Sequence, residues 1–191
     1  MRIAIAIVVL LLAGLVRADE AAWEHLQKGG YVVIMRHALT DPPRGEDPPG
    51  FTYDDCATQR NLSPRGIAEA KALGAAFSRR GAAIGEVFSS RYCRCQDTAR
   101  LAFGNYEVWD VLNGYRGPQP WWEAFDFERL LEIRKRLSDP VGGPGNRIIV
   151  THNTHIKALT DLWVDPGEML VVRPLGRMFF TVVGRLRVED Y

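Results

Sequence analysis

The chain has 191 residues, with 24 basic and 23 acidic side chains and a formal net charge of only +1. This length is enough for one domain around a single hydrophobic core. The near-neutral balance argues against general nucleic-acid binding, which needs a basic face.

The first 18 residues have the pattern of a secretory signal peptide. Arg2 gives a basic start, residues 3–16 are almost wholly apolar, and small or medium residues precede the end at Ala18. Because this apolar run is short for a membrane span, we expect cleavage after Ala18 and a periplasmic or secreted protein. An uncleaved N-terminal anchor is the alternative.

Removal of residues 1–18 would leave 22 basic residues against 23 acidic ones. Residues 19–191 would then form the single domain. No later segment of the sequence is apolar for long enough to cross a membrane.

Three cysteines, Cys56, Cys93 and Cys95, lie in the expected mature chain. An exported protein meets an oxidising environment in which disulfides persist. Cys93 and Cys95 are too close in sequence, at an expected helix start, to pair easily with each other. The sequence therefore predicts a bridge from Cys56 to one of them. The odd cysteine would be a buried thiol or an intermolecular link.

The first predicted elements are a strand, a long loop and a helix. The apolar run at residues 31–35 ends on a charged pair and is typical of a buried strand. Residues 38–61 form a loop rich in proline and glycine, of a length usual for functional lids or disordered segments. Ser63 and Pro64 predict the start of a helix that Gly81 ends. Its buried face is expected to carry Ile67, Ala70, Leu73 and Phe77.

Strands and helices alternate along the rest of the chain. Further strands are predicted at residues 87–89, 106–109 and 147–150. Further helices are predicted at residues 93–103, about 123–137 and 154–163. The last two strands, at residues 168–172 and 178–183, are joined by a short turn and should form a hairpin. This order predicts an α/β fold with a mostly parallel sheet, helices on both faces, and a mixed edge.

Four side chains suited to phosphate chemistry stand at equivalent places in this pattern. Arg36 and His37 follow the first strand, and Arg94 opens the helix after the second. His152 follows the strand at 147–150. Because open α/β sheets bind ligands at the carboxyl ends of their strands, these side chains should converge.

The chemistry of these residue types points to a phosphate monoester. Arginine forks match phosphate oxygens and stay charged. A neutral imidazole can attack phosphorus and hold the phosphoryl group, and flanking arginines disfavour the imidazolium form. The helix start at Arg94 would add backbone N–H groups that favour an anion.

Three motifs in this order resemble those of the histidine phosphatase superfamily, also called phosphoglycerate mutase-like. They are Arg36-His37-Ala38 with Thr40, residues 89–98 with Arg94 four positions before Thr98, and Val150-Thr151-His152-Asn153. The resemblance extends from about residue 31 to 163. It implies a three-layer α/β/α sandwich with a mostly parallel central sheet, and an enzyme that uses no metal and no organic cofactor.

The resemblance also implies roles for individual residues. His37 would be the nucleophile. The residues that bind phosphate and stabilise the transition state would be Arg36, Arg94 and His152. Thr40 and Asn153 would add substrate contacts.

One departure concerns the acid that protonates the leaving group. Many family members place it after the third strand, often as Leu-Asn-Glu, whereas this chain has Gly114 after Leu112 and Asn113. The replacements considered are Asp110, Glu123 and Glu168. A leaving group of low pKa needs less proton assistance. The sequence therefore leaves open a displaced donor or a restricted substrate range.

We interpret the chain as an exported phosphoric monoester hydrolase that acts through phosphohistidine on His37. Candidate substrates are sugar phosphates, envelope glycolipid phosphates, other small esters and a phosphoprotein. A phosphate-binding module of the same fold, with weak or no catalysis, is the alternative that the missing acid motivates.

Other residues have two interpretations. His152, His155 and the Cys93-X-Cys95 pair suggest a zinc site, although neither spacing matches a common zinc motif. Core packing is expected, ahead of a substrate wall, for the aromatic residues Trp121, Trp122, Phe125 and Phe127. A role in the pocket is left open for Arg60 and Asn61.

Overall fold

The computed structural model describes residues 19–42, 45–114 and 126–191. Its main sheet has six strands in the order β5-β4-β6-β1-β7-β8. Four of them are parallel, namely β1 (Val32–Arg36), β4 (Ile84–Ser89), β5 (Glu107–Val108) and β6 (Asn146–Thr151). The final hairpin of β7 (Met169–Gly176) and β8 (Phe179–Leu186) is antiparallel, and β7 also runs antiparallel to β1. The predicted mixed, mostly parallel sheet is confirmed.

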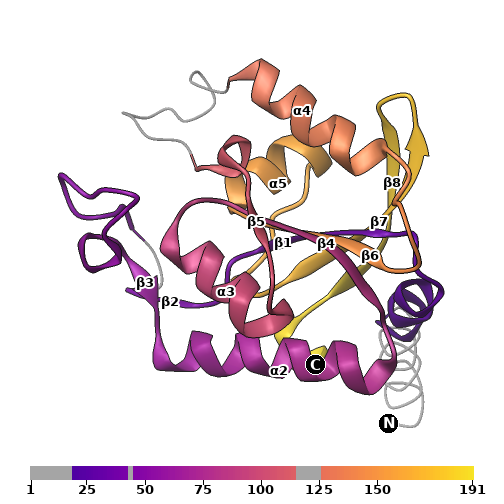
Figure 1. Cartoon of the computed structure of the whole chain (residues 1–191), viewed down its shortest axis with the longest axis horizontal. Coiled ribbons are helices and arrows are strands. Elements are labelled where there is room, and N and C mark those ends of the chain that lie inside the picture. Colours follow the sequence, from indigo (N-terminus) through magenta and orange to yellow (C-terminus); the bar gives the residue numbers. More distant parts are fainter. Residues whose placement is uncertain (1–18, 43–44, 115–125) are drawn as a thin grey trace, which may run out of the picture.

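Helices cover both faces of this sheet (Figure 1). One face is covered by α2 (Pro64–Arg80) and α3 (Cys93–Phe103), and the other by α4 (Phe127–Ser138) and α5 (Asn153–Thr160). A further helix at residues 19–28 precedes β1. Short 3-10 turns lie at Cys56–Thr58, Asp110–Leu112 and Val188–Asp190. This is the three-layer α/β/α sandwich that the sequence predicts.

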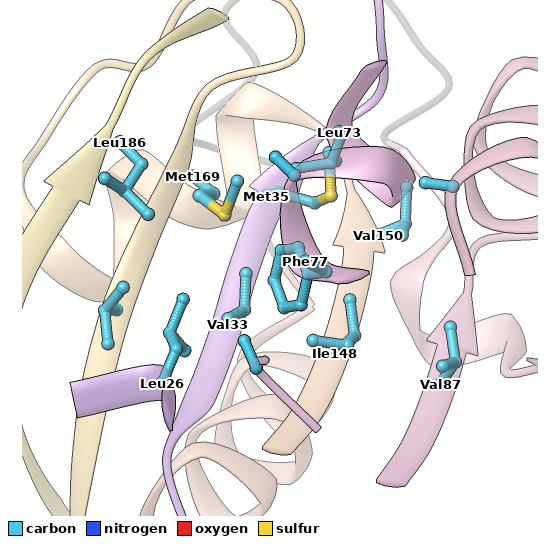
Figure 2. Close-up of a cluster of buried hydrophobic side chains, with 14 of the residues drawn as sticks. Leu26, Val33, Met35, Leu73, Phe77, Val87, Ile148, Val150, Met169 and Leu186 are labelled. Atoms are coloured by element: carbon cyan, nitrogen blue, oxygen red, sulfur yellow. The ribbon is translucent and has the colours of Figure 1, made fainter. Parts of the chain in front are cut away.

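The central position of β1 explains why its sequence is a continuous apolar run. Val33 and Met35 pack into the cluster on the α2 side, which Figure 2 shows around Phe77. Val32 and Ile34 pack into a second cluster on the α4 and α5 side. A strand covered on both faces has no polar side, so strict alternation is lost. Its carboxyl end then leads directly to His37.

Local signals set the ends of α2. The Ser63 hydroxyl accepts a hydrogen bond from the Gly66 amide at 3.0 Å, and Gly81 closes the helix at φ +68°. The expectation that Ile67 is buried is wrong, because this side chain is 38% exposed. Gly66 faces the core in its place: a Cβ there would lie 1.9 Å from the Leu39 carbonyl oxygen, so only glycine permits this close approach.

The helix predicted at about residues 123–137 spans Phe127–Ser138. The Asp126 side chain caps α4 by accepting from the amides of Glu128 and Arg129. Phe127 is 70% exposed, so core packing is wrong for this residue; its three aromatic companions lie outside the described residues. The buried face of α4 is set instead by Ile133 and Leu137, four residues apart.

The long loop after β1 has structure of its own. Its ends form a small two-stranded sheet of β2 (Thr40–Asp41) and β3 (Asn61–Leu62), beside α3 (Figure 1). Cys56, within the loop, is bonded to Cys93 at the start of α3. The predicted disulfide is therefore present, and Cys95 remains as a buried thiol.

The expected signal peptide, residues 1–18, lies outside the described residues. In the part of the chain that is described, no helix combines the length and the apolar character needed to span a membrane.

Candidate active site

Strand pairing brings the two predicted histidines together. β1 and β6 are parallel, with Arg36 opposite Thr151. His37 and His152 come one residue later on each strand, so both emerge at the same sheet edge. Their ring centroids are 5.6 Å apart with an interplanar angle of 66°. Both side chains are buried, at 3% and 7% exposure.

Hydrogen bonding determines the tautomer of His37. Its Nδ1 lies 2.8 Å from the carbonyl oxygen of Ala38, which can only accept, so Nδ1 carries the proton. Nε2 therefore keeps its lone pair. Burial, followed by the charges of Arg94 and Arg36, holds the pKa of His37 well below its usual value. The ring is thus a neutral nucleophile held in one orientation.

Thr98 couples His37 to the start of α3. Its hydroxyl oxygen accepts from the Ala38 amide at 3.0 Å, and its proton goes to the Arg94 carbonyl oxygen at 2.7 Å. The threonine four residues after Arg94 in the sequence therefore links the loop after β1 to the helix turn that carries the arginine.

His152 is oriented by a hydrogen-bonded chain. The Arg91 amide donates to Asn113 Oδ1 at 2.8 Å, and the Ser90 hydroxyl donates to the same oxygen at 3.1 Å. Ser90 Oγ then accepts from Nε2 of His152, 3.0 Å away. Burial, followed by the Arg94 charge and His37, also holds the pKa of His152 well below its usual value.

Arg94 is buried at the centre of the site. Its guanidinium lies 4.2 Å from the centroid of the Tyr92 ring, a cation–π contact. Its Nη1 donates to both carboxylate oxygens of Asp47, at 2.9 and 3.1 Å. Asp47 was not among the expected site residues, because a carboxylate in a proline-rich loop has no motif that reveals its position.

Arg60 lies beside Arg94 and is therefore part of the site. Its amide donates to Asp47 Oδ1 at 2.9 Å, and its Nη1 donates to Thr40 Oγ1 and to the Pro42 carbonyl oxygen. Thr40 thus contacts Arg60 at the site. Asn61 instead donates within its own loop, to the carbonyl oxygens of Cys56 and Gln59.

Positive charge exceeds negative charge in this arrangement. Burial and then Arg94 lower the pKa of Arg60, and Arg36 lowers it further. The Nε atoms of Arg60 and Arg94 are buried without a hydrogen-bond partner among the described residues. Buried polar groups without a protein partner are rare in native structures, and a bound anion is one explanation for them. These donors suit phosphate oxygens.

Arg36 and Asn153 lie on another side of the site. Arg36 Nη1 donates to the Val164 carbonyl oxygen at 3.2 Å, and Asn153 Oδ1 accepts from the Val164 amide at 3.1 Å. Both side chains line a cavity of about 460 Å³ together with Trp163, Val164 and Asp165. The helix that was expected to reach Trp163 ends at Thr160, which leaves the indole half exposed at the cavity wall.

The three proton-donor candidates lie in different surroundings. Glu168 accepts from Arg185 and from the Asp165 amide, and it lines a separate cavity of about 230 Å³. Asp110 is exposed and reaches His152 only through Asn113 and Ser90. Glu123 lies outside the described residues.

Gly114 abuts the His152 ring. A Cβ at this position would lie 3.1 Å from Cδ2 of His152 and 3.2 Å from Cγ, so a side chain would require the ring to give way. Any acid at this position would therefore have to displace the His152 ring slightly.

The zinc interpretation loses one ligand, because Cys93 is bonded to Cys56. Burial raises the pKa of the Cys95 thiol to about 12, and burial lowers the pKa of His155 to about 4. His155 Nδ1 lies 3.1 Å from Thr151 Oγ1. Among the described residues, no three His, Cys, Asp or Glu side chains are grouped to hold a metal ion.

Comparisons with known proteins agree with this geometry. The family model described as histidine phosphatase superfamily (branch 1) matches residues 32–113, a range that includes Arg36, His37 and Arg94. Residues 32–113 are thus similar to the histidine phosphatase superfamily. The resemblance seen in the sequence is therefore confirmed. No curated protein matches the sequence significantly.

Solved structures of this histidine phosphatase fold are similar over most of their length. The protein histidine phosphatase SixA complexed with tungstate is 14% identical, with a TM-score of 0.57, and covers 84% of this chain and 98% of its own. The α-ribazole phosphatase of Shigella flexneri is 17% identical, with a TM-score of 0.56, over 80% and 94%. TTHB049 of Thermus thermophilus is 20% identical, with a TM-score of 0.57, over 82% and 99%. At these identities the likeness establishes the fold.

Proposed function

We propose that this chain hydrolyses phosphate monoesters through a phosphohistidine intermediate on His37. The observation that carries the proposal is a neutral His37 ring whose Nε2 lone pair lies beside buried arginines and a second histidine. Nε2 attacks phosphorus, the ester bond breaks, and the ester oxygen leaves as an alcohol after it takes up a proton. Water then attacks phosphorus, the P–N bond breaks, and phosphate and neutral His37 are regenerated.

The cationic groups have a defined task in this reaction. Phosphoryl transfer passes through a loose transition state whose charge lies on the equatorial oxygens. Arg36 and Arg94 would hold these oxygens, and the phosphate charge would favour a proton on Nδ1 of His152 that lets this ring join them. Thr40 and Asn153 help to orient their neighbours. Because the site is buried, its donors act in a low dielectric, where electrostatic stabilisation is strongest.

The neighbours support an oxyanion ligand. SixA was solved with tungstate, a tetrahedral oxyanion like phosphate, and the Shigella flexneri neighbour is an α-ribazole phosphatase. The cavity of about 460 Å³ beside Arg36 offers room for the organic part of a small ester such as a sugar phosphate. The Cys56–Cys93 bridge supports export to an oxidising compartment, where envelope glycolipid phosphates would be substrates.

The second candidate function is a phosphate-binding module with little catalysis. Gly114 favours it, because glycine has no side chain to protonate a leaving group. The unpartnered arginine donors would bind phosphate in either case.

A panel of phosphate esters tests the proposed function. The purified chain should release phosphate, and His37→Ala should lower kcat/KM by at least about 10⁴-fold, because the nucleophile is lost. His25→Ala is the matched control, since this histidine stacks on Tyr31 in the segment before β1. Alkaline quenching should trap phosphohistidine in the wild type and not in His37→Ala. Phosphate binding without turnover of any ester would establish the binding module instead.

A further inference from the structure

Asp47 carries a carboxylate into the centre of the site from a loop that has no catalytic motif. Its side chain is only 7% exposed. Both oxygens contact Nη1 of Arg94, and Oδ1 also accepts from the Arg60 amide. The disulfide at Cys56 ties the same loop to the start of α3, one residue before Arg94.

The form of this ion pair leaves room for a second anion. A carboxylate that binds arginine in the usual fork uses two guanidinium nitrogens. Asp47 uses Nη1 alone, and Nε of Arg94 has no partner among the described residues. A phosphate that takes the remaining donors of Arg94 would therefore lie directly beside the Asp47 carboxylate.

Two anions that share one guanidinium favour a proton on one of them. A dianionic phosphate is repelled by the carboxylate, whereas a monoanionic phosphate brings a proton that the two groups can share. A carboxyl group that takes over this proton can donate it to a leaving oxygen within its reach. In the free protein, the same group is held in place by Arg94 and Arg60, so its position is set before substrate binds.

We propose that Asp47 is the proton donor for the leaving group, a role that rests on the proposed function. As Nε2 of His37 forms its bond to phosphorus, the electrons of the ester P–O bond move to the ester oxygen, which takes the proton of the Asp47 carboxyl group. Alcohol leaves, and Asp47 is a carboxylate again. It next accepts a proton from the attacking water as the P–N bond breaks, which restores both groups.

Leaving-group dependence is the decisive measurement, with kcat/KM as the readout because it reports transfer to His37. Asp47→Asn should lower kcat/KM by about 10²–10⁴-fold for alkyl phosphates, whose leaving oxygen needs a proton. For aryl phosphates of low leaving-group pKa, the loss should stay below about tenfold. Asp47→Glu, which keeps an acid, should recover part of the alkyl activity.

The matched control is Asp54→Asn in the same loop. Asp54 pairs with Arg91 at the surface and its side chain is 83% exposed, so neither ester class should lose more than about twofold. Equal losses on both ester classes in Asp47→Asn would overturn the proposal, because a residue that only positions Arg94 affects every phosphate alike.

The wild type offers a test that does not need the variant to fold. With a donor in place, log kcat/KM should fall only shallowly as the leaving-group pKa rises. Turnover of aryl esters with none of alkyl esters would leave the proposed function intact and overturn the role of Asp47. Turnover of neither class would overturn the proposed function itself. Isothermal titration with inorganic phosphate should show binding to Asp47→Asn that is at least as tight as to wild type, since one anion is removed.

Discussion

Asp47 and Glu168 are both buried carboxylates that meet two basic residues, yet their surroundings differ. Glu168 accepts from Arg185 and from the Asp165 amide, and Arg187 lies 3.5 Å from it. Its arginines belong to β8 and to the segment after it, and both are partly exposed. Asp47 meets Arg94 and the Arg60 amide, and both of these arginine side chains are buried.

The difference lies in what remains unsatisfied. No polar atom of Glu168 or Arg185 is among the buried groups without a partner in the described part of the chain. Arg60 and Arg94 each keep an unpartnered Nε, and Arg36 adds a third cation to their field. A structural ion pair satisfies its own donors, whereas a ligand site leaves donors for the ligand.

Removal of the disulfide should show that the Asp47 region depends on a covalent tether. The bridge closes a loop with a sequence separation of 37. In the chain-entropy model, replacing Cys56 and Cys93 together by alanine should lower the free energy of unfolding by about 4 kcal/mol. Denaturant titration measures it, with Cys95→Ala as the thiol control. If the free energy of unfolding falls by less than about 1 kcal/mol, the other contacts of the loop keep it in place without the bridge.

Arg94 should matter for catalysis more than for stability. Arg94→Ala removes the guanidinium that bridges Asp47 and the phosphate, so kcat/KM should fall by about 10²–10³-fold, or about 3–4 kcal/mol. Arg185→Ala, at the Glu168 pair, should leave kcat/KM of the folded protein within about twofold. Similar catalytic losses in the two variants would contradict the division between a ligand site and a structural pair.

Glu168→Gln tests the structural side of the comparison. The loss of its charge leaves Arg185 and Arg187 unneutralised, although their partial exposure lets water compensate. We expect the free energy of unfolding to fall by about 1–3 kcal/mol, measured by denaturant titration. Selective loss of alkyl phosphate turnover would instead identify Glu168 as the proton donor.

Acid should destabilise the protein through the buried histidines His37, His152 and His155, a group that has no counterpart at Glu168. As the pH falls below about 6.5, unfolded histidines take up protons, whereas His37, His152 and His155 stay neutral in the fold. The unfolded state therefore binds more protons, and the free energy of unfolding falls by about 1.4 kcal/mol per pH unit for each such histidine.

His155→Asn isolates one of these contributions. Its pKa of about 4 means that wild type should lose this share of stability between about pH 6.5 and 4. In that range, the free energy of unfolding of the variant should change with pH less steeply than that of wild type, by about 1.4 kcal/mol per pH unit. Denaturant titration at several pH values measures this slope. An unchanged slope would show that His155 is protonated in the folded state.

Local patterns predicted the framework of the molecule. Ser63 and Pro64 start α2, and Gly104 ends α3, because caps and left-handed turns depend on a few neighbouring residues. The helix at residues 93–103 has the predicted bounds. The buried face of α2 depends on packing and was predicted less accurately. Ile67 is exposed there, and Gly66 lies on the buried face instead.

The sequence by itself determined that strands ending on Arg36, His37 and His152 would share one sheet edge, since strand and helix alternation allows few other arrangements. Only the tertiary structure decided that Asp47 and Arg60 join Arg94, that Cys93 is the partner of Cys56, and that Gly114 abuts His152. Loop residues have no periodicity to reveal a face. Their positions follow from long-range contacts that form after the sheet has placed the strand ends.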